Sequence, residues 1–116
     1  MTDPQLRLLK GTLDVLILRT LSWGPAHGYA ISRWLRQSSG NELKIEEGAL
    51  YPALRRLEER DLIESDWRRS ESGREARVYR LTRAGEGELR RDLAEWRRYI
   101  RVFSQVLESK PVEALT

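Results

Sequence analysis

The sequence predicts a mainly α-helical protein with one small β-hairpin and a long C-terminal helix. Leu50, Leu54 and Leu57 recur at spacings of four and three, which places them on one face of a helix. Two segments of alternating residues, separated by Ser72-Gly73, have the pattern of paired β-strands. Apolar residues at heptad spacing begin at Leu89. These three patterns together favour a winged helix-turn-helix followed by a C-terminal dimerisation helix.

Length and composition limit the classes of protein to consider. A chain of 116 residues with 40% hydrophobic residues suits one small domain with a modest core. The sequence contains no cysteine, which excludes disulfides, thiolate catalysis and thiolate metal sites. Its longest apolar run, Val15 to Leu18, is too short to span a bilayer, and its first residues form no signal segment. We therefore expect a soluble, cytoplasmic protein.

The first helix is predicted from Leu6 to Leu21, where apolar residues are dense on more than one side. Such a helix is buried on more than one side. We expect the domain core to cover one face and another element, such as a partner chain, to cover the other. Trp23-Gly24-Pro25 ends the helix, because glycine permits a tight reversal and the residue before proline avoids the helical conformation.

A second helix is predicted from about His27 to Gln37, and the turn-rich segment Ser38 to Asn41 closes it. His27 is interpreted as a helix-start residue, because no second metal ligand and no nucleophile pattern accompanies it. The segment Leu43 to Ile45 has two interpretations. It either leads into the third helix or pairs with the hairpin as a third short strand.

The third helix carries the leucine face described above. Pro52 lies inside it and removes the backbone hydrogen bond to the carbonyl of Gly48. We therefore expect the helix to start near Gly48 or to open slightly in its first turn. The acids Glu46 and Glu47 stand at its head and would repel phosphates unless they cap the helix or point away.

The remaining faces of the third helix offer candidate contact groups. Tyr51 lies off the leucine face, and this position favours exposure over the alternative of a core aromatic residue. Arg55 and Arg56 are both within reach of Glu59 along the helix. We expect one of these arginines to pair with Glu59 and the other to face phosphate.

The predicted hairpin concentrates positive charge. Ile63 to Arg68 and Val78 to Leu81 alternate in the manner of strands. From Trp67 to Arg80 there are five arginines and two acids, a net charge of +3 that equals the net charge of the whole chain. Clustered charge, rather than the overall pI near 9.6, indicates a nucleic-acid partner. Single arginines in such turns are often only solvated, whereas Arg74 is placed to enter a minor groove.

Thr82 is the expected N-cap of a last helix from Arg83 to about Ser109. The apolar spacings of four, three, four, three and four define a seam that needs a partner, and we predict that it forms a homodimer. The seam residues are Leu89, Leu93, Trp96, Ile100, Phe103 and Leu107. We thus expect a winged helix-turn-helix DNA-binding domain at 1–82, a dimerisation helix at 83–109 and a frayed tail at 110–116.

Several short motifs occur in a fixed order along the chain. They are Leu13 to Leu18, His27 to Ile31, Gly48 to Leu54, Arg56 to Glu58, Ser72 to Arg74, Tyr79 to Thr82 and Ala84-Gly85. In these motifs the sequence resembles the PadR family of bacterial transcriptional regulators, specifically its short members with a single C-terminal helix. Asp61 departs from the family, which usually has glycine after the third helix, and aspartate adopts a left-handed cap less readily.

The resemblance implies a sequence-specific DNA-binding regulator, a repressor that binds a near-palindromic operator as a homodimer. Its two recognition helices would lie about 34 Å apart, one turn of DNA. In short members it implies release by a small planar aromatic effector, for which Trp96 is the expected stacking residue; an ordinary packing role for Trp96 is equally open. The expected DNA-binding residues are Lys44, Gly48, Ala49, Tyr51, Pro52, Arg55, Arg74 and Arg77.

Other functional classes receive less support from the residues. We expect no enzyme, because the sequence has no patterned carboxylate pair, phosphate loop or metal-ligand spacing. Accordingly, no catalytic residue, metal site or cofactor is assigned. The alternative is a winged-helix module that binds protein instead of DNA, although such a module usually lacks concentrated arginines in its hairpin. A DNA-binding protein of this kind would be associated with the nucleoid when bound.

Overall fold

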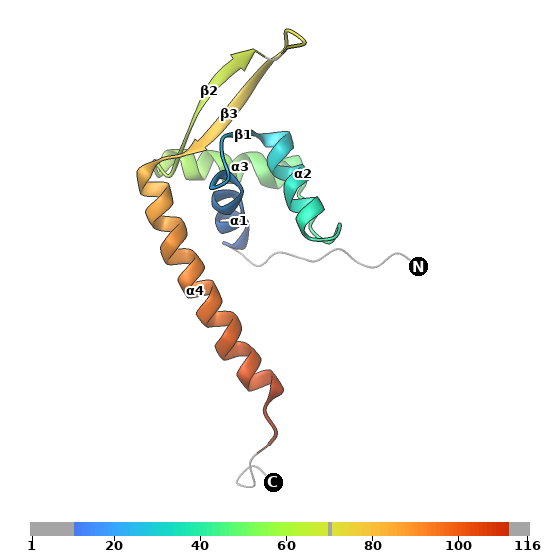
Figure 1. Cartoon of the computed structure of the whole chain (residues 1–116), viewed down its shortest axis with the longest axis vertical. Coiled ribbons are helices and arrows are strands. Elements are labelled where there is room, and N and C mark those ends of the chain that lie inside the picture. The colour runs from blue at the N-terminus through green and yellow to red at the C-terminus, as the bar shows by residue number, and fades with distance from the viewer. Residues whose placement is uncertain (1–10, 70, 112–116) are drawn as a thin grey trace.

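The computed structural model of the chain describes residues 11–69 and 71–111. Its elements are α1 (Thr12–Leu21), β1 (Ala26–His27), α2 (Gly28–Ser38), α3 (Glu47–Glu59), β2 (Ile63–Arg69), β3 (Glu75–Leu81) and α4 (Arg83–Glu108). Helices α1 to α3 form a compact group, the β2–β3 hairpin projects from it, and α4 extends away from it (Figure 1). This arrangement confirms the predicted mainly α fold with a small hairpin. None of the described helices is long and apolar enough to cross a membrane.

Helix α1 is the centre of the domain core. It packs against α2, α3 and α4, so that the second apolar face expected for this helix is covered in part by α4 of the same chain. The first helix was predicted to begin at Leu6; residues 6–10 lie outside the described residues, and the described helix runs from Thr12 to Leu21, which confirms the predicted end. The largest fully buried side chains come from α1, α2, α3 and β2: Ile17, Leu18, Ile31, Leu35, Leu50, Leu54, Leu57 and Ile63.

The sheet has three antiparallel strands in the order β1-β3-β2. Its third strand is Ala26–His27, in which Ala26 pairs with Tyr79. The alternative placement of that strand at Leu43 to Ile45 is therefore wrong; this segment has no regular structure, and the Ser32 hydroxyl donates to the Ile45 carbonyl at 3.4 Å. His27 also caps α2, since its Nδ1 accepts the Ala30 N–H at 3.1 Å, which confirms its helix-start role.

Helix α3 begins at Glu47, one residue before the predicted start near Gly48. Pro52 lies inside the helix, and because Gly48 is exposed, water can satisfy the carbonyl that Pro52 leaves without a partner. Glu46 is the N-cap residue, but its side chain makes no capping hydrogen bond. Glu46 and Glu47 are both exposed, and Glu46 occupies the N-cap position without capping the helix through its carboxylate.

The turn after α3 joins the helix to both β2 and α4. Asp61 has φ 59°, so this aspartate adopts the left-handed conformation for which the resemblance had expected glycine. The Leu62 N–H donates to the Leu57 carbonyl at 3.0 Å and closes the helix. The Thr82 hydroxyl donates to the Asp61 carbonyl at 2.6 Å and accepts the Gly85 N–H at 3.0 Å, which confirms Thr82 as the N-cap of α4.

Helix α4 divides the predicted dimer seam into two parts. Leu89 is only 5% exposed within the single chain and belongs to its core, so the chain itself already buries this first residue of the predicted seam. Leu93 and Trp96 pack partly against the same core, because the first half of α4 lies along the domain. Further along, Ile100, Phe103 and Leu107 remain 58%, 50% and 67% exposed.

Candidate nucleic-acid interface

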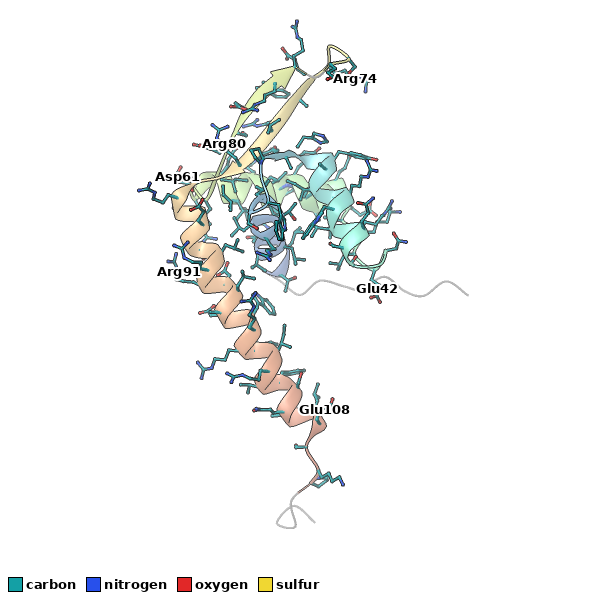
Figure 2. The ribbon with its side chains drawn as sticks, viewed as in Figure 1. Glu42, Asp61, Arg74, Arg80, Arg91 and Glu108 are labelled. Carbon is teal, nitrogen blue, oxygen red and sulfur yellow. The ribbon has the colours of Figure 1, made fainter. Side chains whose placement is uncertain are left out.

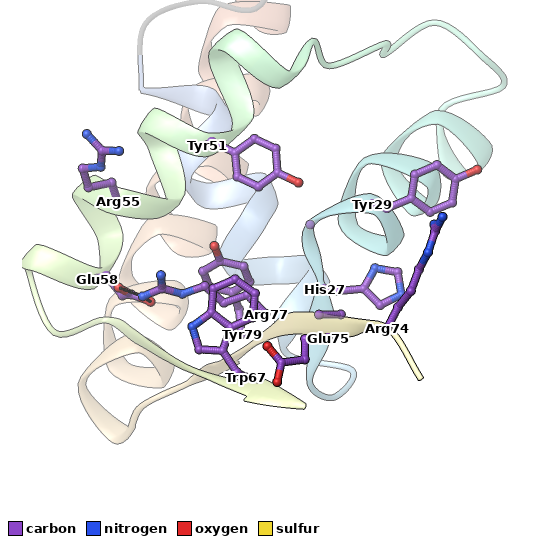
Figure 3. A pocket seen from close by; sticks show the side chains of 12 residues that line it. His27, Tyr29, Tyr51, Arg55, Glu58, Trp67, Arg74, Glu75, Arg77 and Tyr79 are labelled. Atoms are coloured by element: carbon purple, nitrogen blue, oxygen red, sulfur yellow. Dashed lines mark hydrogen bonds and ion pairs between the residues drawn. The ribbon is translucent and has the colours of Figure 1, made fainter. Parts of the chain in front are cut away.

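An open groove of about 880 Å³ lies between the exposed face of α3 and strand β3 of the hairpin. Figure 3 shows Tyr51 projecting from α3 toward the start of α2 and Arg55 at the other edge of α3, with the hairpin residues below them in this view. The end of β1 and the start of α2 close a third side. The lining residues are His27, Gly28, Tyr29, Tyr51, Arg55, Glu58, Trp67, Arg74, Glu75, Ala76, Arg77 and Tyr79.

The exposed face of α3 follows from the burial of its leucines. Leu50, Leu54 and Leu57 are all buried in the core, and the helical period then turns Tyr51 and Arg55 outward. Tyr51 is 45% exposed, which confirms its predicted position off the core face. The other predicted contact residues of this helix are exposed as well, and they are Gly48, Ala49 and Pro52.

Tyr51 is held against the start of α2 by a close approach to Gly28. A Cβ atom placed on Gly28 would lie 2.9 Å from the Tyr51 hydroxyl oxygen and 3.2 Å from two ring carbons. Gly28 is buried, and its backbone is not in the left-handed region, so glycine serves here to leave space for the ring. The Tyr51 side chain is therefore positioned by packing before any ligand binds.

The two arginines of α3 have different environments. Arg56 forms an ion pair with Asp14 of α1 at 3.0 Å. The prediction that one of the two arginines pairs with Glu59 is wrong for the part of the chain that the structure describes. Arg56 pairs with Asp14 because α1 packs beside α3 and brings the Asp14 carboxylate within reach of the guanidinium group. Arg55 is exposed and has no ion pair among residues 11–69 and 71–111, so its charge is available to a ligand.

Arg77 links the hairpin to α3. Its Nη2 lies 3.1 Å from Oε2 of Glu58, and its Nε donates to the Ser65 hydroxyl at 2.7 Å. The Ser65 hydroxyl in turn donates to Glu58, which closes a three-residue cluster. Burial raises the pKa of Tyr79, which lies beside this cluster. Arg77 was predicted to contact DNA, but its charge is compensated here and its contacts fix the hairpin against α3.

Ion pairs also neutralise part of the positive charge predicted for the hairpin. Arg80 bonds both Glu64 at 2.9 Å and Asp66 at 3.0 Å, and Arg80 lowers the pKa of Asp66 below its ordinary value. Arg68 also pairs with Asp66, at 3.4 Å. The predicted charge of +3 did not include Glu64 and Asp66; from 63 to 81 the hairpin has five arginines and four acids, a net charge of +1.

Arg74 stands at the tip of the hairpin, where Gly73 forms the turn with φ +83° (Figure 2). It is exposed, lines the groove, and has no ion pair among the residues that the structure describes. Arg74 and Arg55 thus supply unpaired cations to the groove from the hairpin and from α3. The remaining predicted residue, Lys44, is exposed in the loop before α3 and lines a separate hollow.

Two exposed aromatic residues at the groove were not predicted from the sequence. Tyr29 stacks on His27 with ring centroids 6.3 Å apart, and Trp67 lies on the hairpin with the Arg77 guanidinium 5.9 Å from its ring. Both are more than 60% exposed. The sequence did contain a signal for Tyr29, because this large aromatic residue directly follows a glycine at a helix start and lies on the polar side of α2.

Trp96, the predicted effector-stacking residue, lies outside this groove on α4. It is partly buried and meets the Tyr99 ring edge-on at 5.6 Å, and Tyr99 stacks on Phe103 at 5.4 Å. These rings form an aromatic row along the exposed half of α4. In the described part of the chain, no group of three or more acidic or histidine side chains is arranged to hold a metal ion.

Comparison with known proteins gives consistent matches. The model of the transcriptional regulator PadR-like family matches residues 17–91. A Lysinibacillus sphaericus protein named "Uncharacterized protein X" is 32% identical over 104 residues, covering 87% of this chain and 95% of that protein. A PadR family transcription regulator from Clostridium difficile is similar with TM-score 0.74 and 32% identity over 84% of this chain and 99% of that one. One from Eggerthella lenta gives TM-score 0.75 and 35% identity over 87% and 86%.

Proposed function

The chain belongs to the transcriptional regulator PadR-like family, and from this premise we propose that it is a repressor that binds a near-palindromic operator as a homodimer. Membership in the family supports DNA-binding transcription regulation and gives no support to an enzyme. The observation that carries the proposal for this chain is the groove between α3 and the hairpin, where Arg55 and Arg74 bring unpaired positive charge to both sides of the exposed Tyr51.

In the proposed complex, α3 enters the major groove and the hairpin lies along the flanking backbone. Tyr51 faces base edges or sugar, and Arg55 faces a phosphate or a guanine edge. Gly48 and Ala49 have little or no side chain, so the start of α3 can approach the DNA closely. Arg74 at the hairpin tip contacts phosphate or a narrow minor groove. The remaining proposed contact residues are Lys44, Pro52 and Arg77, the last mainly by positioning the hairpin.

The exposed half of α4 supplies the proposed dimer contact. Ile100, Phe103 and Leu107 continue the heptad seam beyond the part that the chain itself covers, and Tyr99, Val102 and Val106 widen the exposed apolar surface. An apolar surface of this extent on a helix favours association with a second copy. A two-fold dimer would present two α3 helices about 34 Å apart, which matches successive major grooves on one face of DNA.

The proposed switch is a planar aromatic compound that binds among the rings of Trp96, Tyr99 and Phe103 near the dimer contact. Stacking on aromatic rings would stabilise such a ligand. It would release the operator only if it binds better to a dimer with altered spacing of the two α3 helices, since a ligand shifts populations by its differential affinity. Repression follows when the bound dimer blocks a promoter.

Equilibrium binding to duplex DNA tests the proposal. Fluorescence anisotropy with the DNA upstream of the gene and with random duplex gives affinity and its salt dependence. We expect Tyr51→Ala to lower operator affinity by about 1–3 kcal/mol and to leave binding to random duplex nearly unchanged. Arg55→Gln should make the salt slope shallower by about one unit if Arg55 meets phosphate.

The matched control for Arg55→Gln is Arg98→Gln, which removes the same charge from an exposed position on α4 without an ion pair in the described part of the chain. Equal effects of the two variants would mean that only net charge matters. Absence of salt-dependent DNA affinity in the wild-type protein would overturn the proposal and favour a protein-binding winged helix.

A further inference from the structure

We propose that a second cationic surface, formed by Arg33 and Arg36 of α2 and Lys44 of the following loop, binds the DNA backbone beside the first turn of α3. We call it the α2 surface. This inference rests on the proposed DNA binding and extends it to Arg33 and Arg36, which have no role in the groove between α3 and the hairpin. The ligand is the phosphate backbone of duplex DNA.

The α2 surface borders a hollow of about 440 Å³ between α2 and the start of α3. Ile31 and Leu35 are fully buried on one side of α2, and the period of the helix turns Arg33 and Arg36 to the opposite side. The hollow is lined by Tyr29, Ser32, Arg33, Arg36, Lys44, Ile45, Glu46, Glu47 and Gly48.

The three cations of the α2 surface are free of ion pairs throughout residues 11–69 and 71–111, although Glu46 and Glu47 line the same hollow. Elsewhere in the domain, the arginines that meet carboxylates form pairs of 2.8 to 3.4 Å. Like charges gathered without partners repel one another, and an anion that binds among them removes this repulsion. The α2 surface therefore has the charge arrangement of an anion-binding site.

The loop that carries Lys44 is held against α2 by hydrogen bonds. The Ser39 hydroxyl accepts the Leu43 N–H at 2.9 Å and donates to the Arg36 carbonyl at 3.1 Å. The Asn41 N–H donates to the same carbonyl at 2.9 Å, and Asn41 has φ 70°. Since these bonds fix the loop at the end of α2, Lys44 is positioned beside the two arginines before DNA binds.

The α2 surface is continuous with the groove described above, because Tyr29 lines both hollows. Helices α2 and α3 pack against each other, and the hairpin contacts both of them, so that Arg74 at its tip lies beside His27 and Tyr29 at the start of α2 (Figure 3). A helix in the major groove has a sugar-phosphate backbone on each side. With Arg74 beside the start of α2, the α2 surface is placed to continue the backbone contacts along α2 and past the first turn of α3.

Glu46 and Glu47 restrict where the phosphate can lie. Both are exposed at the first turn of α3, and a phosphate directly over that turn would meet their negative charge. The favourable position for the phosphate is therefore on the α2 side of the hollow, next to Arg33 and Arg36. The proposed phosphate contact is therefore on the α2 side of the first turn of α3 and not directly over that turn.

The test is the double variant Arg33→Gln/Arg36→Gln, measured for affinity against salt concentration with upstream DNA and with random duplex. We expect weaker binding to both DNAs and a salt slope shallower by about two units, because two phosphate contacts are lost. Thermal unfolding should be unchanged, since both side chains are exposed. The matched control is Arg98→Gln/Arg101→Gln, which makes the same change in net charge on α4 and should leave the slope unchanged.

The possible outcomes separate this inference from the proposed function. If Tyr51→Ala still weakens operator binding but Arg33→Gln/Arg36→Gln has the wild-type slope, the α2 surface does not bind DNA and the proposed function stands. If the α4 control lowers the slope equally, the effect is one of net charge and the inference is wrong. If the wild-type chain has no DNA affinity, both proposals fail. Should the double variant unfold more readily, Arg33→Gln alone provides the same test, with an expected slope change of about one unit.

Discussion

Gly85→Ala should strongly destabilise the protein, because the N-terminus of α4 lies directly on the turn that follows α3. A Cβ atom at position 85 would lie 2.0 Å from the carbonyl oxygen of Leu62, whereas side-chain carbons essentially never approach within 3.0 Å. The obstacle is backbone, so a rotamer change cannot relieve the clash. Helix α4 must therefore move away from Leu62 by about 1 Å or more.

This movement weakens specific hydrogen bonds. The Leu62 carbonyl accepts the Thr82 N–H at 3.1 Å, and the Thr82 hydroxyl donates to Asp61 at 2.6 Å. Overpacking costs about 1–3 kcal/mol and each lost hydrogen bond about 1 kcal/mol, while alanine recovers about 0.5–1 kcal/mol of helix propensity. The expected net loss in the free energy of unfolding is about 2–4 kcal/mol, which lowers Tm by roughly 8–16 °C in a domain of this size.

Gly87→Ala is the matched control, two residues further along the same helix. A Cβ atom there would meet only the guanidinium ends of Arg91 and Arg90, at 3.6 and 3.8 Å, which is ordinary contact. This variant should gain about 0.5–1 kcal/mol from helix propensity. Both are measured by thermal unfolding followed by circular dichroism, at one chain concentration because association raises Tm. A Tm for Gly85→Ala within about 2 °C of the wild type would refute the close packing of α4 on this turn.

Four further predictions test the interface, the assembly, the switch and the burial of one carboxyl group. Gly28→Ala should displace the Tyr51 ring, whose hydroxyl would lie 2.9 Å from the new Cβ, so operator affinity should fall several-fold in anisotropy titrations while Tm stays within a few degrees of wild type; an unchanged affinity would mean that the ring position is unimportant. Ile100→Glu should give a monomer or an unfolded chain in sedimentation, because burying an unpaired charge costs several kcal/mol, and an intact dimer would exclude this seam. Burial raises the pKa of Asp92 above its unfolded value, so the stability of the folded state falls as the pH rises from the unfolded pKa through the raised pKa of Asp92. Asp92→Asn should therefore raise Tm at pH 7 and leave it unchanged at pH 3. Equal shifts in Tm at pH 7 and pH 3 would contradict this cause. Trp96→Ala should abolish most of the fluorescence quenching by planar aromatic dyes and their release of the operator, whereas surviving quenching would assign Trp96 to packing alone.

The elements predicted most accurately have a strong local period. The leucine face of α3 and the long apolar stripe of α4 are repeated over several turns, so the helical period alone places them. The hairpin was also predicted, because its strands alternate on both sides of a glycine turn. By contrast, the two-residue strand Ala26–His27 is too short to have a period, and it forms only because β3 offers an open edge.

The features that could not be predicted from the sequence depend on contacts between segments that are far apart in the chain. Arg56 pairs with Asp14, 42 residues away, in preference to an acid on its own helix, because helix packing brings the two groups together. Arg77 is held by Glu58 across a separation of 19 residues. Its positive charge is therefore less available to a ligand than its position in a basic hairpin suggested. Likewise, the heptad pattern of α4 does not distinguish Leu89, which contacts its own domain, from Leu107, which is exposed.

Hydroxyl-radical footprinting of the upstream DNA tests the central claim most directly, namely that α3 and the hairpin read duplex DNA as parts of a symmetric dimer. The account predicts two protected segments on one face of the DNA with centres about 10 base pairs apart, and Tyr51→Ala should lose both at a concentration that saturates the wild type. Absent protection, or uniform protection that Tyr51→Ala reproduces at the same concentration, would contradict it.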